Sequence, residues 1–164
     1  QDDSQGSLLY SDELLPRQRY TRGGNGSETV DPALLEELVR QYNGGGTSSD
    51  VAYWLVAAYL STNQRSNADT YLRDALERFP NDTRFYNLAA ILSYKRDDPA
   101  AAEAHLQAAL ALERTPVLLV NLAILLRQQG DEAKAEALLR EAQEGPAGPG
   151  IKDFARKLAT ENAP

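Results

Sequence analysis

The sequence contains no cysteine and no methionine, and it has a single histidine, His105, and a single tryptophan, Trp54. Without cysteine, the chain has no disulfide, no thiolate metal ligand and no cysteine nucleophile. One histidine is too few for the usual histidine-based metal sites and catalytic triads. We therefore expect no metal, no cofactor and no catalytic residue, which argues against an enzyme.

Long apolar runs and an excess of positive charge are absent as well. No apolar run approaches the roughly 18 residues that are needed to cross a bilayer. The chain carries 17 basic and 24 acidic residues, a formal net charge of −7. This balance argues against nucleic acid or an anionic membrane as the main partner. We expect no nucleic-acid binding and no direct membrane insertion.

The start of the chain suggests where the protein works. It begins at Gln1 and continues with the polar stretch QDDSQGS, which we interpret as the remainder after removal of an upstream segment such as a signal peptide. Together with the lack of cysteine, this favours a bacterial protein that is periplasmic or otherwise exported. A cytoplasmic location stays open.

Composition divides the chain into four segments. Residues 1–30 are rich in Gly, Ser, Asp and Arg, with apolar side chains only in small groups, and we expect either a flexible tail or a segment that docks elsewhere on the protein. Residues 31–48 are expected to form an N-terminal flanking helix and a glycine-rich linker. We expect three helix pairs over residues 49–145 and a C-terminal capping helix within residues 146–164.

Apolar side chains recur at helical spacing from Asp31 onward. No segment alternates with a period of two, so we expect no strands. Ser66 with Asp69 resembles a capping box. Three expected starts place a proline after a capping residue: Asp31-Pro32, Asp98-Pro99 and Thr115-Pro116. The expected helices span residues 32–42, 50–63, 66–79, 83–95, 99–113, 116–129, 132–143 and 150–161.

The same helix pair occurs three times. The second helices align without gaps as ADTYLRDA (68–75), AEAHLQAA (102–109) and AEALLREA (135–142), with spacings of 34 and 33 residues. The first helices align as YWLVAAYL (53–60), YNLAAILS (86–93) and VNLAILLR (120–127), with spacings of 33 and 34. A period near 34 built from helix–turn–helix units is typical of a solenoid. The reversed order of the spacings predicts an unusual turn in the second pair, near Lys95 to Pro99.

This pattern resembles the tetratricopeptide repeat over about residues 49–143. Small residues such as Ala68, Ala102 and Ala135 fall where that family packs its paired helices closest. The resemblance implies an all-α fold, a right-handed α-α superhelical solenoid of about three helix pairs with flanking helices. The family's tryptophan-like position is held by Ala52, Phe85 and Leu119, which makes this a divergent member.

The resemblance also implies a concave, apolar, tyrosine-rich groove on the first helices. Its partner-binding residues would be Tyr53, Ala57, Leu60, Tyr86, Ala90, Ser93, Tyr94, Val120, Ile124, Arg127 and Gln128. Tyrosine offers a large contact area and a hydroxyl group, which suits peptide capture, although each groove tyrosine could instead complete the core. Asn87 and Asn121 lie one step away from the inward row. Most of the side chains with which some family members grip a C-terminal carboxylate are absent, so we expect no such clamp.

Three hypotheses about function follow. The first is a non-catalytic scaffold that binds a peptide or helix of a partner protein in the groove, in a bacterial envelope assembly as the resemblance implies. In the second, residues 8–15 fill the groove, and the protein acts through its convex face or through self-association, which leaves a homo-oligomer open. The third is a small-ligand binder or an enzyme, but the glycine-rich stretches GGNGS and NGGGTSS lack the lysine of a phosphate-binding loop.

Overall fold

The computed structural model describes residues 20–22, 28–146 and 149–160. Within them, a short hairpin precedes eight helices: β1 (Tyr20–Arg22), β2 (Glu28–Val30), α1 (Pro32–Asn43), α2 (Ser49–Ser61), α3 (Arg65–Arg78), α4 (Thr83–Lys95), α5 (Pro99–Leu112), α6 (Pro116–Gln128), α7 (Glu132–Glu144) and α8 (Pro149–Thr160). Each helix lies within two residues of an expected segment at both ends. None of the described helices is long and apolar enough to span a bilayer.

The hairpin corrects the expectation that the chain has no strands. β1 and β2 pair antiparallel, with Tyr20 opposite Val30 and Arg22 opposite Glu28. Each strand has only three residues, which is too short for an alternating pattern to appear in the sequence. Residues 8–15, on which the second hypothesis depends, lie outside the described residues.

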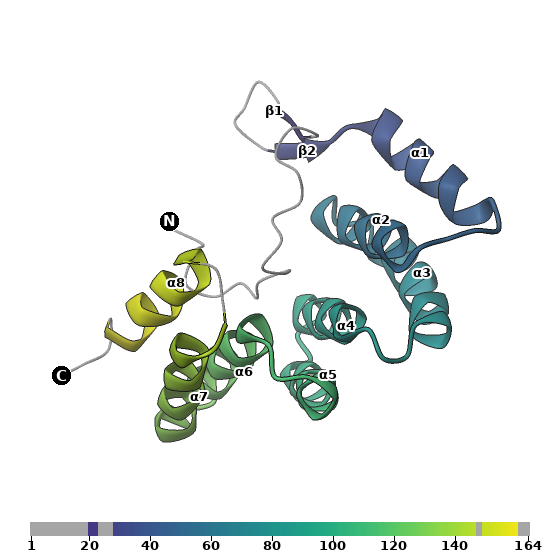
Figure 1. Cartoon of the computed structure of the whole chain (residues 1–164). Helices are drawn as coiled ribbons and strands as arrows, with labels where there is room; N and C mark the ends of the chain where they lie inside the picture. The colour runs from purple at the N-terminus through teal and green to yellow at the C-terminus, as the bar shows by residue number, and fades with distance from the viewer. Residues whose placement is uncertain (1–19, 23–27, 147–148, 161–164) are drawn as a thin grey trace.

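The helices form three antiparallel pairs that stack into a curved array (Figure 1). The pairs are α2–α3, α4–α5 and α6–α7, and each packs on the next through its second helix. α2, α4, α6 and α8 lie on the inner side of the curve, while α3, α5 and α7 lie on the outer side. This is the helical-repeat solenoid that the spacing predicted.

Alanines hold the two helices of each pair together. Ala68, Ala102 and Ala135 are each 0% exposed, and so are the alanines one heptad further along. A side chain of one methyl group lets two helix axes approach toward the short end of the usual range of about 8–10 Å. The small residues of the second helices are therefore contact points of the core.

The turns within the three pairs share one geometry, which makes the predicted unusual turn of the second pair wrong. The turn residues Asn63, Asp97 and Gly130 all adopt left-handed backbone conformations, with φ of 58°, 59° and 86°. After each of them, a backbone N–H donates to the carbonyl five residues earlier, which closes the end of the first helix. Asn and Asp tolerate this conformation better than other side chains do, so they can stand where Gly130 stands.

The first helices therefore repeat with the same spacing as the second helices. Their N-caps, Ser48, Asp82 and Thr115, lie 34 and 33 residues apart, as do the turn residues at their other ends. The alignment of Leu88 with Leu55 is consequently off by one residue in backbone position. Ala89 is the residue of α4 that occupies the backbone position of Leu55.

The predicted helix starts are mostly confirmed. All three proline-marked starts have a capping side chain that accepts a backbone N–H: Asp31 from Ala33, Asp98 from Ala101 and Thr115 from Leu118. The predicted capping box of α3 is wrong. Its N-cap is Gln64, which makes no side-chain capping bond, and Asp69 pairs with Arg73 at 2.9 Å instead.

Incomplete repeats close both ends of the stack. α1 starts 33 residues before α3, and α8 starts 33 residues after α6, so α1 has the place of a second helix and α8 that of a first helix. The Tyr42 hydroxyl of α1 donates to Asp74 of α3, and the Tyr42 ring meets Tyr71 edge-on at 5.1 Å. These contacts attach α1 to the first complete pair.

Replacing Ala102 with leucine is expected to destabilise the protein by about 1–3 kcal/mol, because the larger side chain must force the paired helices apart. Urea denaturation measures the change in the free energy of unfolding. Ala104→Leu is the matched control, since Ala104 is exposed on the same helix, and it should stay within about 0.5 kcal/mol of wild type. Equal stability of the two variants would contradict the packing described here.

Candidate protein-binding surface

The inner side of α2, α4 and α6 carries the eleven residues that the resemblance implied. On α2 and α6 they occupy matching backbone positions, but on α4 the structure shifts the register by one residue. The positions of α4 that match Tyr53, Ala57 and Leu60 are Asn87, Ile91 and Tyr94. We call these matching positions of the three helices, which on α6 are Val120, Ile124 and Arg127, the inner row.

The predicted groove residues differ widely in exposure. Six of them are buried: Tyr53, Ala57, Leu60, Ala90, Val120 and Ile124. Tyr86, Ser93, Tyr94 and Arg127 are half-buried, and Gln128 is exposed. The accessible polar groups of the predicted set therefore lie mainly on α4 and α6.

Two side-chain hydrogen bonds join α4 to α6. The Asn121 amide donates from Nδ2 to Asn87 Oδ1 at 2.7 Å, and both residues are buried, at 0% and 2% exposure. Two helical turns further along, the Gln128 amide donates from Nε2 to the Tyr94 hydroxyl oxygen at 2.9 Å. Each bond spans 34 residues of sequence, so a polar contact crosses from one repeat to the next at two levels. The repeat of asparagine at this spacing was the signal for the buried pair.

The tyrosines of this surface have different surroundings. The Tyr86 hydroxyl donates to the carbonyl of Pro80 at 3.1 Å, which ties α4 to the loop before it. The ring of Tyr53 is 2% exposed and lies under the Arg84 guanidinium, 5.1 Å from the ring centroid. Tyr94 is the tyrosine of the inner row that remains half-exposed and directs its hydroxyl toward Gln128.

Arg127 attaches the last helix to the stack. Its Nη1 donates to the carbonyl of Leu158 at 2.6 Å, near the end of α8, where helix carbonyls lack intrahelical partners. Its Nε donates to Glu132 Oε1 at 2.8 Å, and its side chain is 16% exposed. Both contacts are internal, so Arg127 positions α8 at the edge of the surface. A cavity of about 60 Å³ lies at this junction, lined by Ala123, Ile124, Arg127, Gln128, Leu139 and Leu158.

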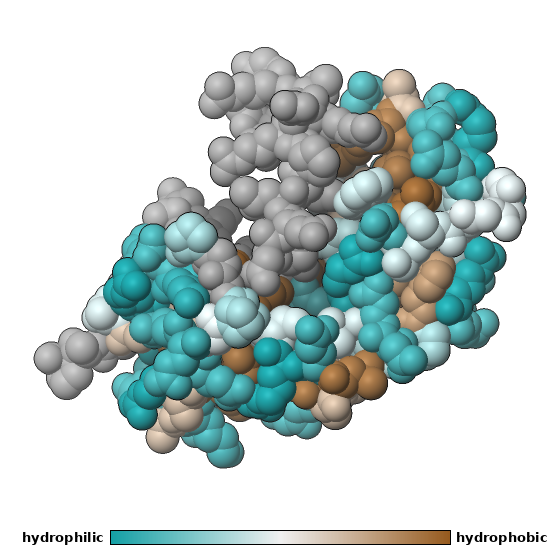
Figure 2. All heavy atoms as spheres, in the orientation of Figure 1, coloured by the Kyte–Doolittle hydropathy of each residue, from teal (hydrophilic) through white to brown (hydrophobic). Residues whose placement is uncertain are grey.

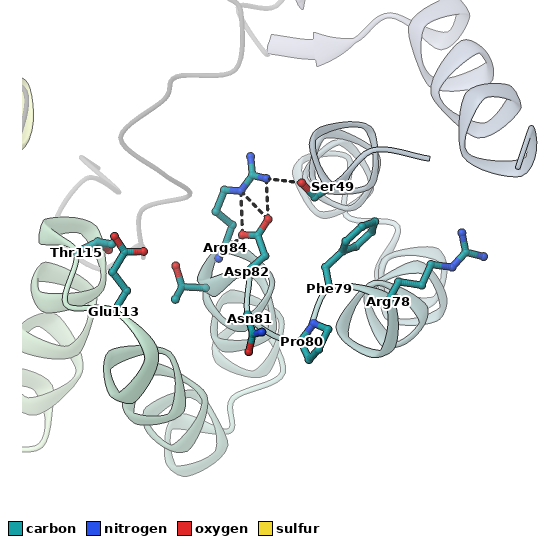
Figure 3. A pocket seen from close by; sticks show the side chains of 10 residues that line it. Ser49, Arg78, Phe79, Pro80, Asn81, Asp82, Arg84, Glu113 and Thr115 are labelled. Carbon is teal, nitrogen blue, oxygen red and sulfur yellow. Dashed lines mark hydrogen bonds and ion pairs between the residues drawn. The ribbon is translucent and has the colours of Figure 1, made fainter. Parts of the chain in front are cut away.

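A second charged cluster lies where α2 and α4 begin (Figure 3). Arg84 pairs with Asp82 at 2.7 Å and with Asp50 at 2.8 Å, and it donates to the Ser49 hydroxyl at 3.2 Å. Burial alone would raise the pKa of Asp82, but the hydrogen bonds and the charge of Arg84 outweigh it and hold that pKa below its ordinary value. The hydrogen bond with Asp82 in turn raises the pKa of Arg84.

A shallow hollow of about 670 Å³ adjoins this cluster, and Arg78, Phe79, Pro80 and Glu113 are among its lining residues. Figure 3 shows Arg84 turned toward Asp82 and Ser49. An anion entering the hollow would have to compete with the two carboxylates that Arg84 already holds. The cluster therefore joins the first two repeats and is poorly suited to bind a ligand.

The described residues offer little for catalysis. They contain no group of three or more His, Cys, Asp or Glu side chains placed to hold a metal ion. His105 is half-buried on α5, where burial lowers its pKa against the opposing charge of Asp98. A half-buried position agrees with the boundary position expected for His105.

The stacked pairs and their inner surface define a helical-repeat protein. Residues 49–82 and 116–141 match models of the tetratricopeptide repeat, and the α4–α5 pair between them keeps the same spacing. The chain is a tetratricopeptide-repeat protein. Repeats of this family generally serve as scaffolds for protein–protein interaction, so the expected partners are proteins. A comparison with curated proteins found no match.

A double-mutant cycle tests the buried asparagine pair. Asn87→Ala and Asn121→Ala are each expected to lower stability, because each leaves a buried amide without its partner on the other helix. The two losses should fall short of additivity by about 0.5–3 kcal/mol, measured by urea denaturation. The exposed bond between Tyr94 and Gln128 is the control, and the cycle Tyr94→Phe with Gln128→Ala should give a coupling below about 0.5 kcal/mol. Additive losses at Asn87 and Asn121 would show that the bond does not join the repeats.

Stability is expected to depend on pH through Asp82. Its folded-state pKa lies below the ordinary value of about 3.9, so the ionised carboxylate stabilises the fold above that value. This contribution is lost as the pH falls through the lower folded-state pKa. Asp82→Asn should therefore destabilise the protein at pH 7, and the deficit should shrink toward about pH 2.

Urea midpoints measured across this range check the prediction. Asp153→Asn is the control, because Asp153 forms an exposed ion pair with Arg156 on α8 and such pairs contribute little. A deficit of Asp82→Asn that stays constant at every pH would rule out the charge of Asp82 as its cause.

Proposed function

We propose that this tetratricopeptide-repeat protein is a non-catalytic scaffold that binds an extended or helical segment of a partner protein along the inner side of α2, α4 and α6. The observation that carries the proposal is the combination of groups on α4 and α6. Tyr94 and Gln128 offer a hydroxyl and an amide beside the apolar side chains Ile91 and Ile124. Such a surface suits a peptide, whose backbone needs hydrogen bonds and whose side chains need apolar contacts.

The setting that we propose is a bacterial envelope assembly, with the protein in the periplasm or otherwise exported. The acidic, cysteine-free composition supports this proposal, and the family resemblance supplies the kind of assembly. The partner would then be another component of the envelope. A groove without the usual carboxylate-binding side chains favours an internal segment of that partner over its C-terminus.

Interaction through the convex face is the second candidate, and α5 favours it. This helix is apolar on nearly all sides, and its outer residues Ala104, Ala108 and Ala111 are exposed, as is Leu112 at 48%. Figure 2 shows a hydrophobic group at the lower edge of the molecule, over α5, within a largely hydrophilic outer surface. A partner or a second copy covering this face would bury it, which is the self-association that the second hypothesis includes. No comparable feature favours a small-ligand binder or an enzyme.

Site-specific cross-linking distinguishes the two faces. The photoreactive residue p-benzoylphenylalanine is placed at Tyr94 on the inner side or at Ala108 on the outer side, and the protein is irradiated in a bacterial periplasmic extract. We expect a discrete cross-linked partner from position 94 that is absent from position 108. Both variants should keep the wild-type unfolding midpoint. Cross-links from position 108 alone would favour the convex face and overturn the inner-side proposal.

A further inference from the structure

We infer that the surface between α4 and α6 has a resident occupant, residues 8–15 of this chain (LLYSDELL), and that a partner binds by displacing it. The inference rests on the proposed function for the identity of the surface, and it adds how that surface is regulated. It also specifies the kind of partner, an extended segment with leucine or aromatic residues on both sides of a short acidic stretch.

The first argument is the burial of α6. Every residue from Pro116 to Leu126 is buried, although a first helix of a repeat normally has one side open to the groove. The helices that pack most closely on α6 are α5, α7 and α8, and none of them belongs to the neighbouring inner position at α4. Val120 and Ile124 of the inner row are nevertheless only 0% and 6% exposed. An apolar segment of the chain seated on the inner row accounts for this burial.

The second argument is where the chain enters the described structure. Val30 of β2 is buried, β2 contacts α2, and the hairpin lies on the inner side of the array (Figure 1). β1 starts at Tyr20, so the segment is delivered beside the first inner helix. Residues 16–19 reach at most about 14 Å and eight extended residues about 28 Å. Three inner helices spaced about 10 Å apart need about 20 Å, so residues 8–15 can cross from α2 to α6.

The third argument is the chemistry of the segment. In an extended chain, alternate side chains point to opposite faces, which places Leu8, Tyr10 and Leu14 on one face. These three match the apolar inner row, and Ser11 and Glu13 then point away from it. The hydroxyl of Tyr94 and the amide of Gln128 lie where they can meet the backbone of such a segment.

The tether favours the chain's own segment over that of a second copy. A short flexible connection gives an effective concentration in the millimolar range, whereas a second copy is present at its bulk concentration. At micromolar protein, the intramolecular contact is therefore the dominant one. A displacing partner must overcome this competition.

Paramagnetic relaxation in the full chain tests the occupant. Because the chain has no cysteine, Ser11→Cys accepts a single spin label, on the face of the segment that points away from the groove. We expect broadening of the amide signals of Asn87, Tyr94 and Ile124, and none at Ala108 on the outer side. A label at Gln107→Cys on the outer side is the control and should give the opposite pattern.

A mixture of spin-labelled chain without ¹⁵N and unlabelled chain with ¹⁵N tests for a second copy. No broadening is expected in this sample. Broadening that occurs only in the mixture would mean that a second copy occupies the surface, and it would overturn the inference. So would unbroadened α4 and α6 signals in the singly labelled chain.

A second experiment uses a fluorescent synthetic peptide of residues 7–16 and measures its binding by anisotropy. In the full chain, Leu8→Glu with Leu14→Glu should release the segment, and this variant should bind the peptide at least about tenfold more tightly than wild type. Ser7→Glu with Ser11→Glu adds the same charge and should behave as wild type. Equal affinity of all three proteins for the peptide would contradict an occupied surface.

The two proposals fail in different ways. If the spin label broadens α4 and α6 but position 94 yields no cross-linked partner, the segment occupies a surface that is not the partner site. If position 94 yields a partner but the label broadens nothing on α4 or α6, the scaffold proposal stands and the resident occupant is wrong.

Discussion

The close approach of paired helices at alanine is the contact on which the rest of the structure depends. Ala68, Ala102 and Ala135 have no exposed surface, and a methyl group there lets the helix axes approach closely. Because each pair has the same small contact, the pairs stack at one spacing. That spacing brings Asn87 within 2.7 Å of Asn121 and sets the distance between neighbouring inner helices. A larger side chain at one alanine would disturb the inner surface as well as the core.

Most of the fold could be predicted because its signals are local. Proline after a capping residue, breaks after each helix and a 34-residue period fix where helices start and stop, and tertiary packing did not override them. The hairpin had no such signal, since three-residue strands carry no period. The turns at Asn63 and Asp97 looked irregular only because their residues differ from Gly130. Their backbone conformation is the same, and the sequence does not display φ.

The candidate site was harder to predict, because an error of one residue moves a side chain about 100° around a helix. Aligning Leu88 with Leu55 by side-chain type placed Tyr86 and Ala90 in the groove. The caps and turns show that Asn87 and Ile91 hold those backbone positions. Exposure was also beyond sequence reasoning, since Arg127 looked like a free cation but is held by Leu158 and Glu132. Periodicity locates helices well, but it locates individual contacts only when the register is supported independently.

Polar contacts between repeats give the inner surface a defined shape before any segment binds. An apolar interface alone tolerates sliding by small steps, whereas the bond between Asn87 and Asn121 forms at one register only, and breaking it while buried is costly. Arg127 fixes α8 by a comparable contact with the carbonyl of Leu158. A surface held in this way loses little conformational freedom when a segment binds, which favours binding. The same rigidity serves a tethered segment and a partner alike, so selection between them depends on their side chains and on the advantage of the tether.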